Sequence, residues 1–362
     1  MTEYRVAYLP GDGVGPEVLA AARRCVDAVA GRAHFSVHWV ECVVGGASID
    51  ATGEPLSADT LAACQGADAV LLGAVGGPRW DDPRATVRPE QALLGLRREL
   101  ELFANLRPVR AVEALAGASP LRPDVRRGAD LLIVRELIGG IYFGQPQGPT
   151  LLGAVDTCAY TRHEIDRVVR LAFELATGRR GHLTSVDKAN VMATGRLWRE
   201  TVDAVAGDFP GVTVAHALVD STAMALVSDP RRFDVLVTEN LFGDILSDEA
   251  AVIAGSLGVL ASASIGERRT AHGAFGLYEP VHGSAPDIAG RGLANPAAAI
   301  GSAAMMLRWS FGRAQAADVL EAALLSVLED GPRTRDLGGE AGTDQVTAAV
   351  IDRLRERAGV AA

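Results

Sequence analysis

Short apolar runs alternate with longer segments of helical periodicity along most of the chain, and this alternation is the feature that most constrains the fold. Apolar runs at 5–9, 36–40 and 69–72 are separated by predicted helices at about 16–30 and 58–64. The pattern resumes with segments at 131–135, 150–157, 162–177, 182–187, 195–206, 213–218 and 235–238, and helices dominate beyond 295. Strands that alternate with helices are typical of a sheet covered by helices, so we predict an α/β fold.

Length and charge limit the domain count and the class of partner. The 362 residues are many for one core, and 48% of them are hydrophobic, so we expect two domains. No low-complexity linker separates them, which favours a shared sheet or an inserted domain. The net charge of -10 argues against nucleic acid or an anionic membrane as the main partner. Without a signal core or a long apolar run, the protein is expected to be cytoplasmic.

Two acidic residues, Asp244 and Asp248, are four positions apart in a predicted helix that begins near 242. This spacing places both carboxylates on one face of the helix, where they repel each other. A hard divalent cation such as Mg²⁺ or Mn²⁺ between them would remove the repulsion, and Asp220 is a candidate third ligand. Alternatively, Asp244 is an acid favoured by the helix dipole and Asp248 is a solvated surface residue.

Three arginines and two proton-transfer candidates lie in other motifs. Arg97, Arg107 and Arg135 could bind carboxylates bidentately, which would imply a substrate with more than one carboxylate; each could also be an ordinary ion-paired arginine. Lys188 follows a predicted strand and could act as a base beside a metal, whereas Tyr142 lies between glycines and could donate a proton. A solvated lysine and a packing aromatic residue are the alternatives.

Two glycine-rich segments suggest a nucleotide site. Residues 9–17 form a strand-to-helix turn, but Pro16 occupies the position where the dinucleotide fingerprint requires its third glycine. Residues 279–296 are rich in turn formers and suit a loop around a nucleotide. Asp287 in this loop could accept hydrogen bonds from ribose hydroxyls and repel a 2′-phosphate, which favours NAD.

Together these motifs resemble the β-decarboxylating dehydrogenases of the isocitrate and isopropylmalate type. The resemblance spans nearly the whole chain and is carried by residues 9–13, 76–81, 102–108, 139–144, 185–191, 242–248 and 282–290. It implies a two-domain, non-Rossmann α/β fold with the active cleft between the domains. Residues 1–103 and 255–362 would bind the cofactor, and 104–254 would carry dimerisation, metal and substrate residues. The resemblance also implies a homodimer with active sites shared between subunits.

The implied reaction is NAD-dependent oxidative decarboxylation of (2R,3S)-3-isopropylmalate to 4-methyl-2-oxopentanoate and CO₂ in leucine biosynthesis. Another alkylmalate, tartrate or homoisocitrate is the alternative substrate, and a non-catalytic subunit is the alternative from another class. The resemblance implies that the three arginines hold the substrate carboxylates and that Asp244 and Asp248 bind Mg²⁺ or Mn²⁺. It also implies that Asp220 and Lys188 reach in from the partner subunit. Lys188 would assist removal of the hydroxyl proton, and Tyr142 would protonate the enol.

The resemblance also assigns the remaining pocket. Leu93 and Leu94 would contact the alkyl group, Val191 would close the pocket, and Glu90 would approach both substrate and nicotinamide. The full cofactor set is Val14, Glu90, Asn190, His282, Gly283, Ser284, Ala285, Asp287, Ala294 and Asn295.

One residue and one segment differ from the family pattern. Ile138 occupies a position where the family usually has threonine, either as a neutral packing change or as part of an altered pocket. Residues 266–273 are polar and are predicted to form an exposed loop.

Overall fold

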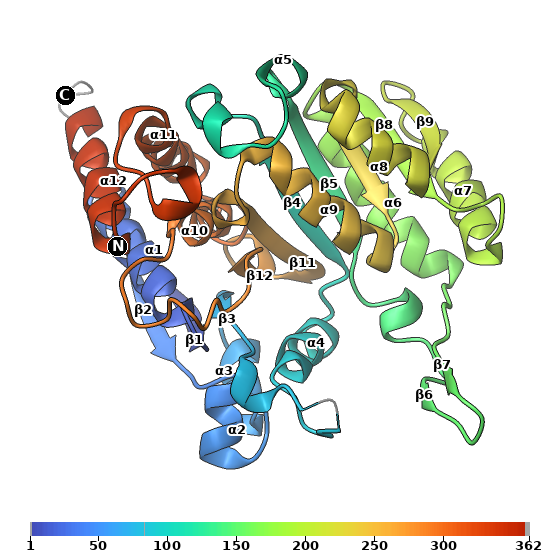
Figure 1. Ribbon diagram of the computed structural model, residues 1–362, viewed down its shortest axis with the longest axis horizontal. Coiled ribbons are helices and arrows are strands. Elements are labelled where there is room, and N and C mark those ends of the chain that lie inside the picture. Colours follow the sequence, from blue (N-terminus) through green and yellow to red (C-terminus); the bar gives the residue numbers. More distant parts are fainter. Residues whose placement is uncertain (1, 83, 359–362) are drawn as a thin grey trace. The chain divides into compact units, whose positions relative to one another are not determined.

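The computed structural model describes residues 2–82 and 84–358 and confirms the α/β class (Figure 1). The chain divides into two compact units. We call the first the terminal unit: residues up to 102, 112–118, and residues from 255 onward. The second, the central unit, contains 103–111 and 119–254. Residues 112–118, which the sequence-based division placed in the central domain, pack with the terminal unit through Leu115 and Leu337.

The terminal unit contains strands in the spatial order β2-β1-β3-β12-β11. β1 pairs in parallel with β2 and β3, β12 pairs in parallel with β3, and β11 is antiparallel to β12. The strands are β1 (Thr2–Gly11), β2 (Phe35–Glu41), β3 (Ala69–Ala74), β11 (Ala261–Arg269) and β12 (Ala274–Pro280). The helices are α1 (Gly15–Ala30), α2 (Gly46–Thr52), α3 (Ala58–Gln65), α4 (Glu90–Glu99), α10 (Ala297–Trp309), α11 (Ala314–Asp330) and α12 (Thr343–Ala358).

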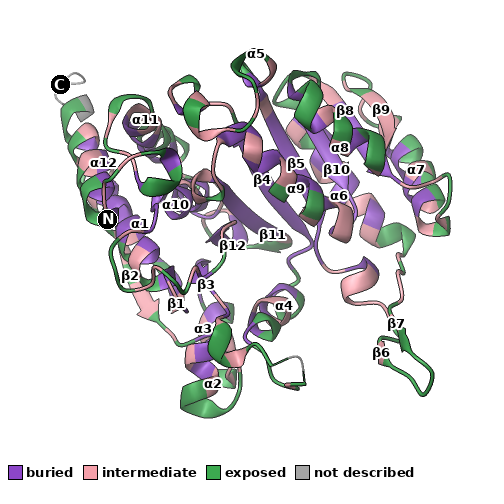
Figure 2. Cartoon of the chain, viewed as in Figure 1, coloured by how far each residue is buried: buried purple, intermediate pink, exposed green. Residues whose placement is uncertain are grey.

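The core of the terminal unit explains how α4 is placed. Every residue of β3 and β12 is buried, as continuous apolar strands covered on both faces should be (Figure 2). Leu96 of α4 packs into the cluster formed by Leu72, Phe275 and their neighbours, and Leu93 packs at its edge. This contact fixes the face of α4 that carries the predicted substrate residues.

The central unit contains strands in the order β4-β5-β10-β8-β9. β5, β10, β8 and β9 run parallel, and β4 is antiparallel to β5. The strands are β4 (Ala104–Arg110), β5 (Asp130–Glu136), β8 (His182–Asp187), β9 (Thr213–Leu218) and β10 (Val235–Thr238), with a small hairpin of β6 (Gly148–Pro149) and β7 (Ala154–Val155). The helices are α5 (Pro123–Arg126), α6 (Arg162–Thr177), α7 (Ala193–Ala206), α8 (Val219–Ser228) and α9 (Asn240–Ala254).

Parallel pairing brings the carboxyl ends of the central strands to one edge, where ligands bind in open α/β sheets. Arg135 lies at the end of β5, Lys188 follows β8, Asp220 follows β9, and α9 begins two residues after β10. The sequence motifs therefore occupy the edge of the sheet that can bear function.

Three local predictions have different outcomes. The helix at 162–177 is confirmed, and Thr161 and Glu164 form a capping box at its start. The strand at 150–157 is wrong: only residues 148–149 and 154–155 pair, and Leu151 and Leu152 are fully exposed at the hairpin tip. The loop at 266–273 is also wrong in part, because β11 extends to Arg269 and only 270–273 form the turn into β12.

Among the described residues, no helix combines the length and the apolar character needed to cross a membrane.

Candidate active site

The acid pair lies on one face of α9, because a single guanidinium contacts both members. Arg107 Nη1 is 3.1 Å from Asp248 Oδ1, and Arg107 Nη2 is 3.5 Å from Asp244 Oδ1. Arg107 Nη1 also donates to Ser247 Oγ at 2.6 Å. Helix α9 begins at Asn240 rather than near 242, since Glu239 accepts a hydrogen bond from the Phe242 amide within its first turn.

Arg135 and Tyr142 meet at the same carboxylate. Arg135 is buried and pairs through Nη1 with Asp244. The Tyr142 hydroxyl donates to Asp244 Oδ2 at 2.9 Å, and the Arg135 guanidinium lies 5.7 Å from the centre of the Tyr142 ring. Gly243 permits this approach of α9 to β5: a Cβ there would lie 2.7 Å from Arg135 Cγ and 2.3 Å from Thr238 Oγ1. The structure therefore brings two predicted arginines, the predicted acid and one predicted metal ligand together.

The electrostatics of this cluster suit an oxygen-liganded cation and a neutral proton donor. Burial raises the pKa of Asp248, and Asp244 raises it further, while Arg107 opposes the change. Burial and the neighbouring Asp244 raise the pKa of Tyr142, so its hydroxyl keeps its proton. The side chains of Asp244 and Asp248 remain 34% and 57% exposed. Their carboxylate oxygens are accessible hard donors, which fit Mg²⁺ or Mn²⁺.

Lys188 and Asp220 form a second pair, with Nζ 2.9 Å from Oδ2. Lys188 lowers the pKa of Asp220. The turn that carries Lys188 is held by Asp187, whose two oxygens accept from Arg199 at 2.9 Å and which also accepts from the Ala189 amide. Within the described part of the chain, no three acidic, histidine or cysteine side chains are grouped to hold a metal ion.

The amino-acid composition also distinguishes Lys188 from the other basic residues. The chain has 35 basic residues of the lysine and arginine type, and Lys188 is its only lysine. All the other residues of this type are arginines. A lysine ammonium can lose its proton in a protein, whereas an arginine guanidinium cannot. Asparagine is also rare, occurring only at 105, 190, 240 and 295. Asn105 and Asn240 were missed as site residues, and both contact predicted substrate arginines.

In the terminal unit, α4 presents the predicted substrate residues at helical spacing. Glu90, Leu93, Leu94 and Arg97 recur at three- to four-residue intervals, so they lie on adjoining parts of one face. Arg97 is buried, and its Nη2 lies 3.1 Å from Glu279 Oε1. Its Nε is buried without a hydrogen-bond partner in the structure, which leaves a donor for a ligand.

The two predicted nucleotide loops of the terminal unit lie against each other. The Val14 amide donates to the Ser284 carbonyl at 2.8 Å. Gly13 has φ of 59°, and a Cβ there would lie 2.0 Å from the Ser284 oxygen, so glycine is required for this contact. Asp12 fixes the first loop by accepting from the Gly46, Ala47 and Gly76 amides, each at 2.8 Å.

The remaining predicted cofactor residues have varied surroundings. Burial lowers the pKa of His282, and its Nε2 is buried without a hydrogen-bond partner among the described residues. Asp287 and Gly283 are exposed, and Ala285 has a positive φ of 36°. Asn295 is engaged structurally, since it accepts from the Ala297 amide at the start of α10 and donates to Asp336. Ala294 is buried beside it, whereas Asn190 and Val191 of the central unit are exposed.

The turn between Arg135 and Tyr142 rests on a buried acid. Glu136 is fully buried and accepts from the amides of Ile138 at 3.0 Å and Gly139 at 2.8 Å. Burial raises its pKa from 4.5 to about 7. The backbone amide of Ile138 therefore stabilises this turn, and this contact does not depend on the identity of the side chain at position 138.

Glu136 predicts a pH dependence of stability. The pKa of Glu136 is higher in the folded state, so the folded protein binds this proton more tightly than the unfolded protein does. The contribution of the protonated Glu136 to the free energy of unfolding is therefore complete below pH 4.5. It falls by about 3 kcal/mol as pH rises through 7. In urea unfolding at pH 5 and pH 8, the wild type should lose more free energy of unfolding than Glu136→Gln. Equal losses in the two proteins would contradict the assignment.

Comparisons with known proteins identify the family of this chain. The isocitrate/isopropylmalate dehydrogenase family model matches residues 5–353. The chain is 54% identical to 3-isopropylmalate dehydrogenase of Anaeromyxobacter dehalogenans, covering 97% of this chain and 99% of the relative. It is 55% identical to the enzyme of the same name from a Synechococcus strain, covering 98% and 99%. The isocitrate dehydrogenase structure from Methylococcus capsulatus is 35% identical, with a TM-score of 0.85 over 97% of this chain and 99% of that one. The chain belongs to the isocitrate/isopropylmalate dehydrogenase family.

Proposed function

We propose that the chain catalyses the NAD⁺-dependent oxidative decarboxylation of 3-isopropylmalate to 4-methyl-2-oxopentanoate and CO₂, the dehydrogenase step of leucine biosynthesis. The observation that carries the proposal is the convergence of Arg107, Arg135 and Tyr142 on the acid pair of α9. This cluster combines carboxylate recognition, a neutral proton donor and hard oxygen ligands. The names of relatives at 54% and 55% identity support the choice of substrate.

Each residue has a separate task in the proposed mechanism. Mg²⁺ or Mn²⁺ held by Asp244, Asp248 and Asp220 would supply Lewis acidity towards the C2 oxygen and its carboxylate. Arg97, Arg107 and Arg135 bind the substrate carboxylates. With NAD⁺ bound as the hydride acceptor, Lys188 would take up the C2 hydroxyl proton, and the carboxylate on C3 would then leave as CO₂. Tyr142 would donate its proton to C3 of the enolate that remains.

The cofactor assignment rests on the paired loops of the terminal unit. Val14 and Ser284 join the loops through their backbones, and exposed Asp287 is available to ribose hydroxyls. Buried Nε2 of His282 lacks a partner within the structure and can bond a ligand. We assign NAD to Val14, Glu90, Asn190, His282, Gly283, Ser284, Ala285, Asp287, Ala294 and Asn295.

A homodimer would complete the proposed site. Helix α8, which carries Asp220, exposes Met224 and Val227, and helix α9, which carries the acid pair, exposes Ile245. Leu151 and Leu152 of the central hairpin are fully exposed as well. Contiguous apolar patches mark protein contacts, and α8 lies against α9, so the exposed apolar side chains of these two helices support a subunit contact there. We propose that Lys188, Asp220 and Val191 enter the site from the partner subunit, and that the dimer works in the cytoplasm.

A panel of 3-substituted malates tests the substrate. With NAD⁺ and Mn²⁺, 3-isopropylmalate should give a much higher kcat/KM than isocitrate, because a third carboxylate would have to be buried against Leu93 and Leu94. Removing the alkyl group should cost about 1–3 kcal/mol in transition-state binding. Ile138 makes another alkylmalate the second candidate, and a higher kcat/KM for isocitrate, tartrate or homoisocitrate would refute the proposed substrate.

Asp287 predicts the cofactor preference. Its carboxylate would repel the 2′-phosphate of NADP⁺, so NAD⁺ should be strongly preferred. Asp287→Lys should move the ratio of kcat/KM values towards NADP⁺, and Asp287→Asn should weaken the preference to a smaller extent. An unchanged ratio of kcat/KM values in the lysine variant would show that Asp287 does not discriminate between NAD⁺ and NADP⁺.

A further inference from the structure

The two predicted substrate arginines of the central unit are each held by an asparagine. Arg107 Nε donates to Asn105 Oδ1 at 2.7 Å. Arg135 donates to Asn240 Oδ1 from both Nε, at 3.0 Å, and Nη2, at 2.8 Å. Asn105 is fully buried and Asn240 is 1% exposed. In both cases the Nη1 end of the guanidinium points to the acid pair of α9.

Other arginines of the same unit have a carboxylate where Arg107 and Arg135 have an asparagine. Arg179 Nε bonds Asp234 at 2.8 Å, and its Nη2 bonds Asp130 at 2.7 Å. Arg199 bonds both oxygens of Asp187. The Arg179 pair lies at the amino ends of β5 and β10, whereas Arg135 lies at the carboxyl end of β5. Arg179 therefore has charged supports at the edge opposite the acid pair, and Arg199 has one beside Lys188, whereas the Nε groups of Arg107 and Arg135 bond neutral amides.

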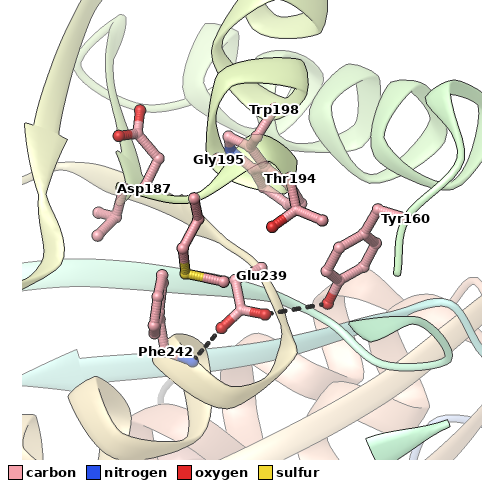
Figure 3. Close-up of a pocket in the computed structure, with 9 residues that line it drawn as sticks. Tyr160, Asp187, Thr194, Gly195, Trp198, Glu239 and Phe242 are labelled. Atoms are coloured by element: carbon pink, nitrogen blue, oxygen red, sulfur yellow. Dashed lines mark hydrogen bonds between the residues drawn. The ribbon is translucent and has the colours of Figure 1, made fainter. Parts of the chain in front are cut away.

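Asn240 also connects the arginine to the turn that carries Tyr142. Its Nδ2 donates to the Gly139 carbonyl at 3.1 Å, and its backbone amide donates to the Tyr160 hydroxyl at 3.0 Å. The same hydroxyl donates to Glu239, which in turn accepts from the Phe242 amide (Figure 3). An amide supplies both an acceptor for Arg135 and a donor for Gly139, which a carboxylate cannot do.

We propose that Asn105 and Asn240 are positioning residues that aim Arg107 and Arg135 without adding a further carboxylate to the acid pair that these arginines already contact, so that the site can accept a dianionic substrate. This inference rests on the proposed function. A carboxylate at either position would hold the arginine at least as firmly, but its charge would oppose a second anion at the same guanidinium. An alanine at either position would leave the charge of the arginine unchanged and would remove only the hydrogen bond that orients it.

Substrate binding without turnover tests the inference. The dissociation constant of 3-isopropylmalate would be measured by calorimetry with Mn²⁺ and without NAD⁺, for the wild type, Asn105→Asp, Asn240→Asp and the alanine variant at each position. The aspartate variants should bind about 10- to 100-fold more weakly, the range given by one charge-assisted interaction. Each alanine variant should lose less. With NAD⁺ present, KM should rise by a larger factor than kcat falls.

Asp234→Asn is the matched control, because it changes an arginine support at the opposite end of the sheet. It should lower the melting temperature and leave substrate affinity unchanged. If an aspartate variant does not fold, Asn→Ser at that position keeps a neutral acceptor and should bind more tightly than the alanine variant.

Three results would overturn the inference while leaving the proposed function intact. Folded aspartate variants that bind as tightly as the wild type would show that neutrality is irrelevant. Alanine variants that bind as weakly as the aspartate variants, or serine variants no better than alanine, would reduce the asparagines to packing residues. A wild type that does not bind 3-isopropylmalate would instead remove the proposed function, and the inference with it.

Discussion

Lys188→Arg is expected to abolish turnover while preserving the fold. Arginine can keep the ion pair with Asp220, which is 2.9 Å from Nζ in the wild type. It cannot take up the substrate proton, because a guanidinium does not release its own proton in a protein, whereas an amine side chain can. Loss of a positioned general base should reduce kcat by about 10²–10⁴-fold. Steady-state kinetics, with circular dichroism as the control for folding, measures this effect.

The single lysine permits an independent chemical test of the same residue. Amine acetylation can modify only one side chain per chain, because Lys188 is the only lysine. The loss of activity should be proportional to the fraction of Lys188 that is acetylated, measured by peptide mass. Substrate with Mn²⁺ should protect Lys188 from acetylation. Arg355→Lys offers a second lysine at an exposed position of helix α12 as a labelling control. A Lys188→Arg enzyme that keeps more than a tenth of wild-type kcat would contradict the assigned role.

Mixing two inactive variants should restore activity if the sites are shared between chains. Lys188→Ala and Asp244→Ala should each be inactive as homodimers. A mixed dimer would contain one site with both residues intact and one site lacking both. After random exchange of equal amounts, half of the dimers are mixed, so activity should reach about a quarter of the wild-type level.

The control uses residues that the proposal assigns to the same chain of one site. Asp244→Ala mixed with Asp248→Ala should remain inactive, since neither mixed site recovers both carboxylates. Lys188→Ala mixed with Asp220→Ala should also remain inactive. If mass measurements verify exchange and the first mixture stays inactive, each site must be built from a single chain.

The sequence predicted the elements whose signals are local. The helix at 162–177 has its own capping box, and the i,i+4 spacing of Asp244 and Asp248 is a property of any helix. Arg135 could be placed because it ends an apolar strand, and the carboxyl ends of parallel strands form one edge. The resemblance then supplied roles that no single motif could assign.

What the sequence missed depends on contacts between distant residues. Asn240 is 105 positions from Arg135, so nothing beside it indicates its function. The apolar pair Leu151-Leu152 suggested a strand, but it lies at a hairpin tip between short paired segments. Residues 266–269 suggested a loop because they are polar. They are largely exposed in the structure, but they still belong to β11, because the end of a strand can carry polar side chains.

The coupling of NADH formation to CO₂ release tests the central claim most directly. Purified enzyme would be supplied with 3-isopropylmalate, NAD⁺ and Mn²⁺, and NADH absorbance and released CO₂ would be measured in the same reaction. The proposed function predicts one NADH and one CO₂ for each substrate molecule consumed, with both signals lost on removal of the divalent cation by EDTA. NADH without CO₂, or no consumption of 3-isopropylmalate, would contradict an oxidative decarboxylation of this substrate.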